Sequence, residues 1–277
     1  MIRFGDMSLP LAISAWVLLF SSAFAKPAGH ILYVNLLGNT AIKLRWIPPG
    51  HFTMGSPPAE LGRGSNENQV SVELTRGYYL AETELTQAQW KLVIPENPSA
   101  FRADNLPVET ITWTDAKRLC DSLNQQQRKA GILPKGYRWD LPTECQWEYA
   151  CRAGTAAALH NGIDLTSVDS KCDHLGQVAW YQENSSGHTS PVGTKKANRW
   201  GLLDMHGNVW EWCRDSYSEC HPGGRDPLVT GGDIHIRRGG SATYQARTSR
   251  AASRDGLEST AKGNGLGMRL ALVPEGS

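Results

Sequence analysis

Apolar and polar residues alternate near the beginning of the chain. The alternation runs from Ile31 to Met54 and is interrupted by Pro48-Pro49-Gly50, which predicts a strand, a turn and a second strand. The polar, glycine-containing stretch at residues 57–68 predicts a loop. Residues 69–80 predict one further strand.

Three segments predict helices. Thr86 is placed to cap a short helix that runs to about Leu92. The strongest helical pattern follows Thr112 or Thr114, where apolar residues recur at i, i+3, i+4 and i+7 and form one buried face: Ala116, Leu119, Cys120 and Leu123. A third helix begins at Thr143, which has the S/T-x-x-Q form of a capping box with Gln146, and ends near Gly154.

The pattern of apolar and polar residues changes after Thr155. Short apolar runs, such as residues 178–181, lie among Gly, Asn, Ser and Pro. We therefore expect few regular elements in this part. The sequence has no internal repeat and no low-complexity linker, so we expect one domain.

The N-terminus has the pattern of a targeting segment. Residues 9–20 are nearly all apolar, follow Arg3 and precede Ala23-Phe24-Ala25. A short apolar run that ends in Ala-x-Ala predicts a cleaved signal peptide, residues 1–25, and a mature chain of residues 26–277 that is periplasmic or secreted. A retained N-terminal anchor is the alternative, and no later stretch is long and apolar enough to cross a bilayer.

Composition narrows the class of protein. The chain has 28 Lys and Arg against 27 Asp and Glu, which gives no electrostatic case for nucleic-acid binding. The abundant Gly (28) and Pro (15), with Trp (10) outnumbering Phe (5), indicate a loop-rich fold held by large aromatic anchors. Six cysteines in an exported chain predict up to three disulfides, with Cys213–Cys220 as one pairing suggested by proximity.

Residues 201–212 contain the densest candidate chemistry. Asp204 and Glu211 are hard oxygen ligands separated by a glycine-containing turn, and calcium combines carboxylates with backbone carbonyls. A capped, solvated loop is the alternative. No H-x-H, H-E-x-x-H, C-x-x-C, G-x-S-x-G or P-loop motif is present. The arginines at 247, 250, 254 and 269 are either buried against loop carbonyls or part of a groove for an anionic or peptide ligand.

Several segments together resemble the formylglycine-generating enzyme (sulfatase-modifying factor) superfamily. They follow the family order along the chain: residues 50–56 (GHFTMGS), 82–87 (ETELTQ), 107–109 (PVE), 112–116 (TWTDA), 137–144 (YRWDLPTE), 147–150 (WEYA), 200–205 (WGLLDM), 207–212 (GNVWEW), 238–241 (RGGS) and 267–270 (GMRL). The resemblance implies a single α+β domain, loop-rich and C-type-lectin-like, with little regular secondary structure.

The resemblance also implies two sites. A structural calcium ion would be held by the Asp204 and Glu211 side chains and by the carbonyls of Gly207 and Val209. A ligand cleft would be lined by the residues that match the family's substrate cleft, together with a nearby tyrosine: Trp210, Ser241, Arg250 and Tyr244.

The sequence departs from the family at its catalytic thiols. The family enzyme binds copper(I) through two cysteines that follow the Gly-Gly-Ser segment. Residues 242–249 contain no cysteine here, and the last cysteine of the chain is Cys220. We therefore expect neither copper binding nor formylglycine generation. The resemblance also implies that one cysteine of each of two family disulfides is kept. Cys120 and Cys151 match family cysteines, but the positions of their partners fall near Ala251 and Leu270.

Three functions follow from this resemblance. The first is an envelope binding or regulatory protein whose cleft holds a peptide of a protein partner, for example in type VI secretion signalling. The second is a cysteine-independent periplasmic oxidase of the siderophore-maturation type, in which either a cleft carboxylate or Tyr244 handles protons. The third, formylglycine generation itself, lacks the required redox groups.

Overall fold

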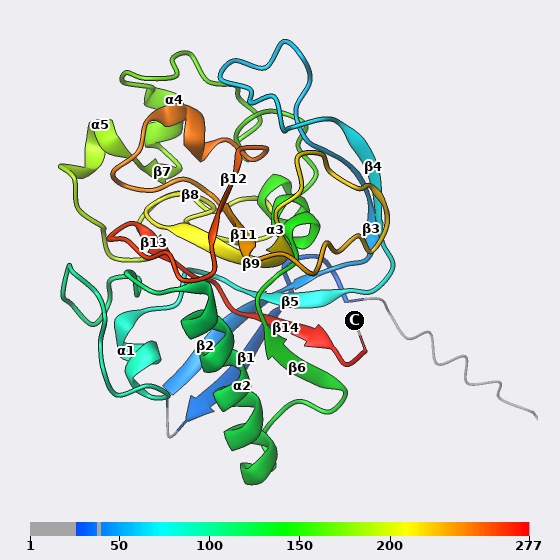
Figure 1. Cartoon of the computed structure of the whole chain (residues 1–277), viewed down its shortest axis with the longest axis vertical. Coiled ribbons are helices and arrows are strands. Elements are labelled where there is room, and N and C mark those ends of the chain that lie inside the picture. The colour runs from blue at the N-terminus through cyan, green and yellow to red at the C-terminus, as the bar shows by residue number, and fades with distance from the viewer. Residues whose placement is uncertain (1–25, 38–39, 277) are drawn as a thin grey trace, which may run out of the picture.

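The computed structural model describes residues 26–37 and 40–276, so the predicted signal peptide lies outside the described residues. One layer is an antiparallel sheet of five strands (Figure 1). Its order is β1 (Ile31–Leu37), β2 (Thr40–Ile47), β5 (Tyr78–Ala81), β14 (Ala271–Pro274) and β6 (Tyr137–Asp140). The helix α2 (Trp113–Ala130) packs against this sheet and covers an apolar cluster that includes Leu36, Leu44 and Leu272.

A second sheet lies in the C-terminal half. Its order is β12 (Arg254–Glu258), β11 (Ile234–Arg238), β9 (Trp210–Ser216) and β13 (Leu266–Gly267), with only β13 parallel to its neighbour. The helix α3 (Glu144–Arg152) contacts β9 and β11 and also reaches β3 (Figure 1). This central position puts α3 between the N-terminal strands and the C-terminal sheet.

Short elements complete the domain. A three-stranded sheet has the order β10 (Gly224–Arg225), β4 (Val70–Leu74) and β3 (Gly50–Met54), and β7 (Ala179–Trp180) pairs with β8 (His206–Gly207). The remaining helices are α1 (Gln87–Lys91), α4 (Asp173–Gly176), α5 (Gln182–Ser185) and the 3-10 helix η1 (Ala246–Ser249). No helix in residues 26–37 and 40–276 is both long and apolar enough to span a bilayer.

The predicted helices are confirmed. Thr86, Thr112 and Thr143 are the N-caps of α1, α2 and α3, and each forms a capping box with the residue three positions on. All four residues of the predicted α2 face are buried. The helix α3 ends at Ala153, which has a left-handed φ of 46° just before Gly154.

Two strand predictions differ from the structure. The single strand expected over residues 69–80 is divided into β4 and β5. Gly77 lies in the break because a Cβ there would approach the Trp46 ring to 2.3 Å. The expectation of few elements after Thr155 missed β9 and β11. Because β9 is buried on both faces, it shows no alternation of apolar and polar residues.

The disulfide prediction is wrong. All six cysteines are free thiols, and only Cys220 is exposed. The other five fill apolar space. Cys120 packs in the cluster under α2, Cys172 packs in a third cluster with Leu175, and the remaining three pack in the cluster around α3: Cys145, Cys151 and Cys213. Ala251 packs in the same cluster as Cys151, and Leu270 in that of Cys120, so apolar contacts replace the family disulfides.

Candidate functional site

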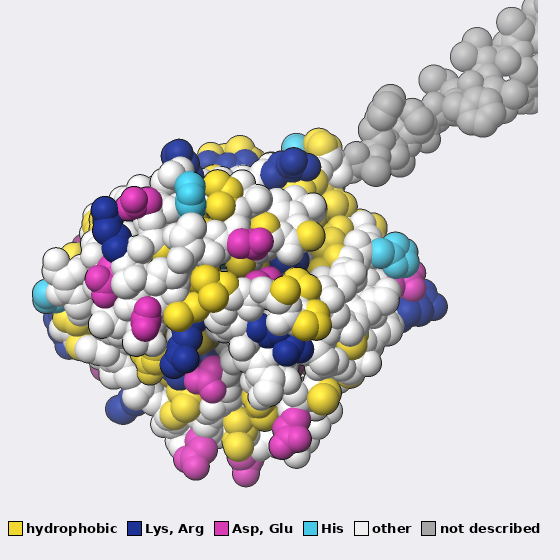
Figure 2. Space-filling model, turned by 90° about the horizontal axis from the view of Figure 1, so that it is seen from above, with side chains coloured by type: hydrophobic (Ala, Val, Ile, Leu, Met, Phe, Trp, Pro, Cys, Tyr) yellow, Lys and Arg dark blue, Asp and Glu magenta, His cyan; other side chains and the backbone are white. Residues whose placement is uncertain are grey.

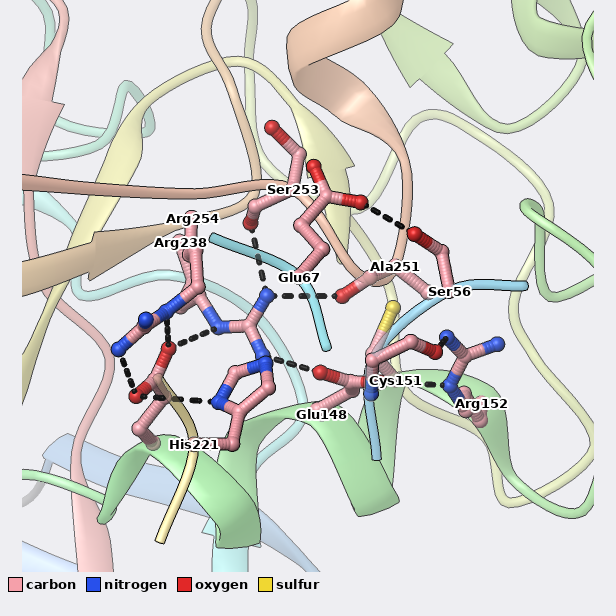
Figure 3. Close-up of polar contacts among 12 residues, drawn as sticks. Ser56, Glu67, Glu148, Cys151, Arg152, His221, Arg238, Ala251, Ser253 and Arg254 are labelled. Carbon is pink, nitrogen blue, oxygen red and sulfur yellow. Dashed lines mark hydrogen bonds and ion pairs between the residues drawn. The ribbon is translucent and has the colours of Figure 1, made fainter. Parts of the chain in front are cut away.

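A network of buried arginines and glutamates surrounds α3 (Figure 3). Glu144 accepts a bidentate interaction from Arg254, with distances of 2.7 and 2.8 Å. Glu148, one turn further along α3, pairs with Arg152 at 2.8 Å and with Arg238. Burial alone raises the pKa of the Glu148 carboxyl, but the charges of Arg152 and Arg238 outweigh it and hold this pKa at about 2.

Arg250 extends the network to the loop between β3 and β4. Its guanidinium donates to Glu67 at 2.8 and 2.6 Å and to Glu60 at 2.7 Å. Four arginines therefore meet four glutamates in the interior, and every one of these charges has an opposite partner. Such pairing is required, because an unpaired buried charge destabilises a fold by several kcal/mol.

The network determines where the C-terminal segments lie. Arg238 is the last residue of β11, and Arg254 is the first residue of β12. Arg238 also donates to the carbonyls of Ala251 and Ser253. The chain between Arg238 and Arg254 is thus held at both ends against α3, and this segment forms one wall of a cleft.

Two adjoining cavities form the cleft. The larger, of about 460 Å³, and the smaller, of about 180 Å³, share Trp210 and Tyr244 in their walls. The larger also includes Arg247 and Asp255, and the smaller includes Lys262. The larger volume lies in the range in which proteins bind small ligands or short peptide segments.

Trp210 is the centre of the cleft wall. Its backbone N–H donates to the Gly265 carbonyl at 2.7 Å, which attaches the 263–266 segment to β9. The guanidinium of Arg237 lies 4.5 Å from the indole centroid, and Tyr244 packs edge-on at 5.8 Å. Arg237 is paired with Asp255 at 2.5 Å. The Trp210 indole N–H, although buried, has no hydrogen-bond partner in the described part of the chain.

The four residues predicted to line the cleft have different positions. Trp210 and Tyr244 line both cavities. Ser241 is fully buried behind the wall, and its hydroxyl contacts that of Thr243 at 3.1 Å. Arg250 lines neither cavity, because its guanidinium is engaged by Glu60 and Glu67. The Arg250 guanidinium therefore belongs to the interior ion-pair network, and its role in ligand binding stays a prediction.

Sequence reasoning missed other wall residues. Arg237, Asp255 and Lys262 line the cleft but belong to no matched motif. The abundance of arginine in the C-terminal part signalled a possible anionic groove, yet it did not separate Arg247, which lies in the cleft, from Arg250, which does not. That separation depends on where Glu60 and Glu67 lie in the fold.

The predicted calcium ligands lie close to a third carboxylate. Asp204 accepts a hydrogen bond from the Gly193 N–H at 2.6 Å, and its other oxygen is buried with no partner in the residues described. Glu211 binds Arg269 with both oxygens, at 2.7 to 3.0 Å, and accepts from the Trp147 indole at 2.6 Å. Glu84 accepts from the Val209 N–H at 2.9 Å.

The charges of this cluster are unequal. Glu84, Asp204 and Glu211 interact with one another and with the guanidinium of Arg269, and the Lys195 ammonium also acts on Asp204. Burial, with a contribution from neighbouring carboxylates, raises the pKa of Asp204 to about 6 and that of Glu84 well above its usual range. A bound cation would neutralise this excess of negative charge.

The donor set fits calcium at Asp204, whose free carboxylate oxygen is an available ligand. Glu211 is already neutralised by Arg269, so it offers no unshared charge. Among residues 26–37 and 40–276, no three His, Cys, Asp or Glu side chains are grouped to hold a metal ion by themselves. Calcium binding at Asp204, Gly207, Val209 and Glu211 stays a prediction.

Comparison with known proteins places this architecture in a family. Residues 38–273 match the model of the sulfatase-modifying factor enzyme 1-like domain. The chain is 30% identical over 268 residues to the formylglycine-generating enzyme of Streptomyces coelicolor, covering 90% of this chain and 73% of that enzyme. The chain therefore belongs to the sulfatase-modifying factor family, as a single loop-rich α+β domain.

Two further relatives are similar over different extents. Chaperone protein LppX of Paenibacillus barcinonensis is 31% identical over 189 residues, which is 52% of this chain and 64% of LppX. The chain thus spans less than two thirds of that relative. The solved structure of Treponema denticola variable protein 1 superimposes with a TM-score of 0.75 at 26% identity, over 88% of this chain and 99% of that one.

The network predicts that alanine substitution at Arg250 lowers the stability of the fold, whereas the same substitution at Arg247 does not. Replacing Arg250 with Ala leaves Glu60 and Glu67 buried without their partner, so we expect the free energy of unfolding to fall by about 3–5 kcal/mol. Arg247→Ala is the matched control, because Arg247 is exposed and its side chain has no partner within the described residues. Urea unfolding measures both. Equal midpoints for the two variants would contradict the assignment.

Proposed function

We propose that this chain is an exported member of the family that binds a segment of a protein partner in the cell envelope and does not generate formylglycine. The observation that carries this proposal is the wall of the Trp210–Tyr244 cleft. The wall after Gly240 is built from residues 243–248, and no cysteine of the described chain lines either cavity. The cleft therefore keeps space and aromatic surface for a ligand without the thiol pair that the family oxidation requires.

The properties of the thiols support this proposal. Burial raises the pKa of Cys120, Cys145 and Cys151 well above the usual range of a thiol. A thiol of this kind stays protonated at neutral pH and is a poor nucleophile and a poor metal ligand. Burial also acts to raise the pKa of Cys172, but hydrogen bonds with Thr166 and nearby backbone outweigh it and lower this pKa. Neither Cys172 nor the exposed Cys220 lines the cleft.

The name of one relative supports the proposal that the ligand is a protein. One of them carries the name chaperone protein, which describes a protein that acts on other proteins. A regulatory component of a secretion system, such as type VI secretion, is one partner class that this function would serve. Export, which this function requires, rests on the predicted signal peptide at residues 1–25.

The central test is capture of the partner through Tyr244. The immobilised protein is exposed to envelope extract of its source organism, and retained proteins are quantified by mass spectrometry. We expect Tyr244→Ala to reduce recovery of a specific partner about tenfold or more, as for an aromatic anchor in an interface. Tyr33→Ala is the control, because Tyr33 is an exposed tyrosine on β1.

Two results would contradict the proposed function. In one, native protein and Tyr244→Ala retain the same proteins in the same amounts. In the other, the purified protein consumes oxygen in the presence of phenolic substrates, which would establish the oxidase alternative.

We also propose that calcium stabilises the fold through Asp204. Calcium at about 100 times its Kd stabilises the native state by roughly 2.7 kcal/mol, which raises the Tm by about 5–10 °C over the value in EDTA. We expect Asp204→Asn to lose most of this difference, since Asp204 has the free buried oxygen. Asp121→Asn, at an exposed position of α2, serves as the control. A native Tm that is the same with calcium and with EDTA would refute the site.

A further inference from the structure

The walls of the cleft carry an excess of positive charge. The charged residues that line the two cavities are Arg237, Arg247, Arg254, Lys262 and Asp255. Asp255 is the single acid among these lining residues. The described residues that line the space around Trp210 and Tyr244 therefore carry four positive charges and one negative charge.

Two of these cations are neutralised within the protein. Arg254 is held bidentately by Glu144, and Arg237 is paired with Asp255. Arg247 and Lys262 are exposed, and neither side chain has a partner in the described part of the chain. Their charges are thus available to a ligand.

The two free cations line different cavities that share one aromatic side chain. Arg247 lines the larger cavity, Lys262 lines the smaller one, and Tyr244 lines both. Tyr244 is 41% exposed, so part of its ring is open to apolar contact. A ligand that occupies both cavities would therefore contact Tyr244 and lie beside both positive charges.

The cleft also contains a buried donor that needs an acceptor. The Trp210 residue is 2% exposed, and its indole N–H has no partner among residues 26–37 and 40–276. A buried donor without an acceptor is costly to the fold.

We propose that the cleft binds an acidic peptide segment. In this arrangement an apolar residue packs on Tyr244, and carboxylates on either side of it meet Arg247 and Lys262. The inference rests on the proposed binding function and specifies the chemistry of the partner segment.

A nucleic acid fits these observations less well. Its recognition uses many cations along the backbone, whereas the described residues that line this cleft include two free cations, one in each cavity. The whole chain has a formal net charge of +1. On the face that Figure 2 shows, side chains of both signs are interspersed, and no broad positive field covers it.

Synthetic peptides test the charge requirement. Three fluorescently labelled peptides with blocked ends carry a central Leu flanked on both sides by Asp, by Asn or by Lys. A fourth is the Asn peptide with a free C-terminal carboxylate, which separates a terminal carboxylate from side-chain carboxylates. Fluorescence anisotropy with the full mature chain gives each Kd at low and at physiological salt.

We expect the Asp peptide to bind about tenfold more tightly than the Asn peptide, as two partly exposed ion pairs allow, and the Lys peptide to bind most weakly. The advantage of the Asp peptide should shrink as salt is added. Arg247→Gln and Lys262→Gln should each weaken the Asp peptide about two- to fivefold. Lys135→Gln and Arg199→Gln, at exposed positions outside both cavities, should leave its Kd unchanged.

Other results would overturn the inference. Equal binding of the Asp and Asn peptides, both weakened by Tyr244→Ala, would leave the binding function standing and remove the acidic segment. A single-stranded DNA oligonucleotide that binds as tightly as the Asp peptide would assign the cleft to polyanions in general. If none of the peptides binds, the inference is also overturned. The proposed function is overturned as well only if the capture experiment recovers the same proteins with native protein and with Tyr244→Ala.

Discussion

The cleft depends on the pairing of charges in the interior. Glu144 and Glu148 project from α3 into a region that water does not reach, and each is neutralised by arginines from other parts of the chain. Because a buried carboxylate without a partner is strongly destabilising, this pairing restricts β11, β12 and the β3–β4 loop to one arrangement. The loop-rich C-terminal half, which has few long elements to support it, thereby obtains a defined shape.

The same constraint separates residues that support the fold from residues that are free to bind. Arg250 and Arg254 are both buried in ion pairs, whereas Arg247 is exposed at the cleft. These arginines lie close together in the sequence, but the glutamates of the β3–β4 loop and of α3 reach only some of them. A ligand site with unpaired cations can therefore lie directly beside an electrically balanced interior.

Local signals in the sequence predicted local structure well. The N-caps Thr86, Thr112 and Thr143 were found because a capping box involves residues only three positions apart. The strand β9 was missed because burial on both faces removes the alternation that marks a strand. The family motifs pointed to Trp210, which lines both cavities, and to Arg250, which lines neither. The position of Arg250 depends on Glu60 and Glu67, about 190 and 183 residues away along the chain, so no local pattern reveals it. Even numbers of cysteines suggested disulfides, but the fold uses these side chains as apolar packing.

Hydrogen–deuterium exchange of the mature chain, with and without the Asp peptide, tests the location of the binding site most directly. The account predicts slower exchange on binding in residues 243–248 and 262–266, which form part of the cleft walls. It also predicts that α3 and β11 are well protected in both states, because the ion pairs hold them in the free protein. Protection on binding that appears only outside these walls, or rapid exchange of α3 in the free protein, would contradict it.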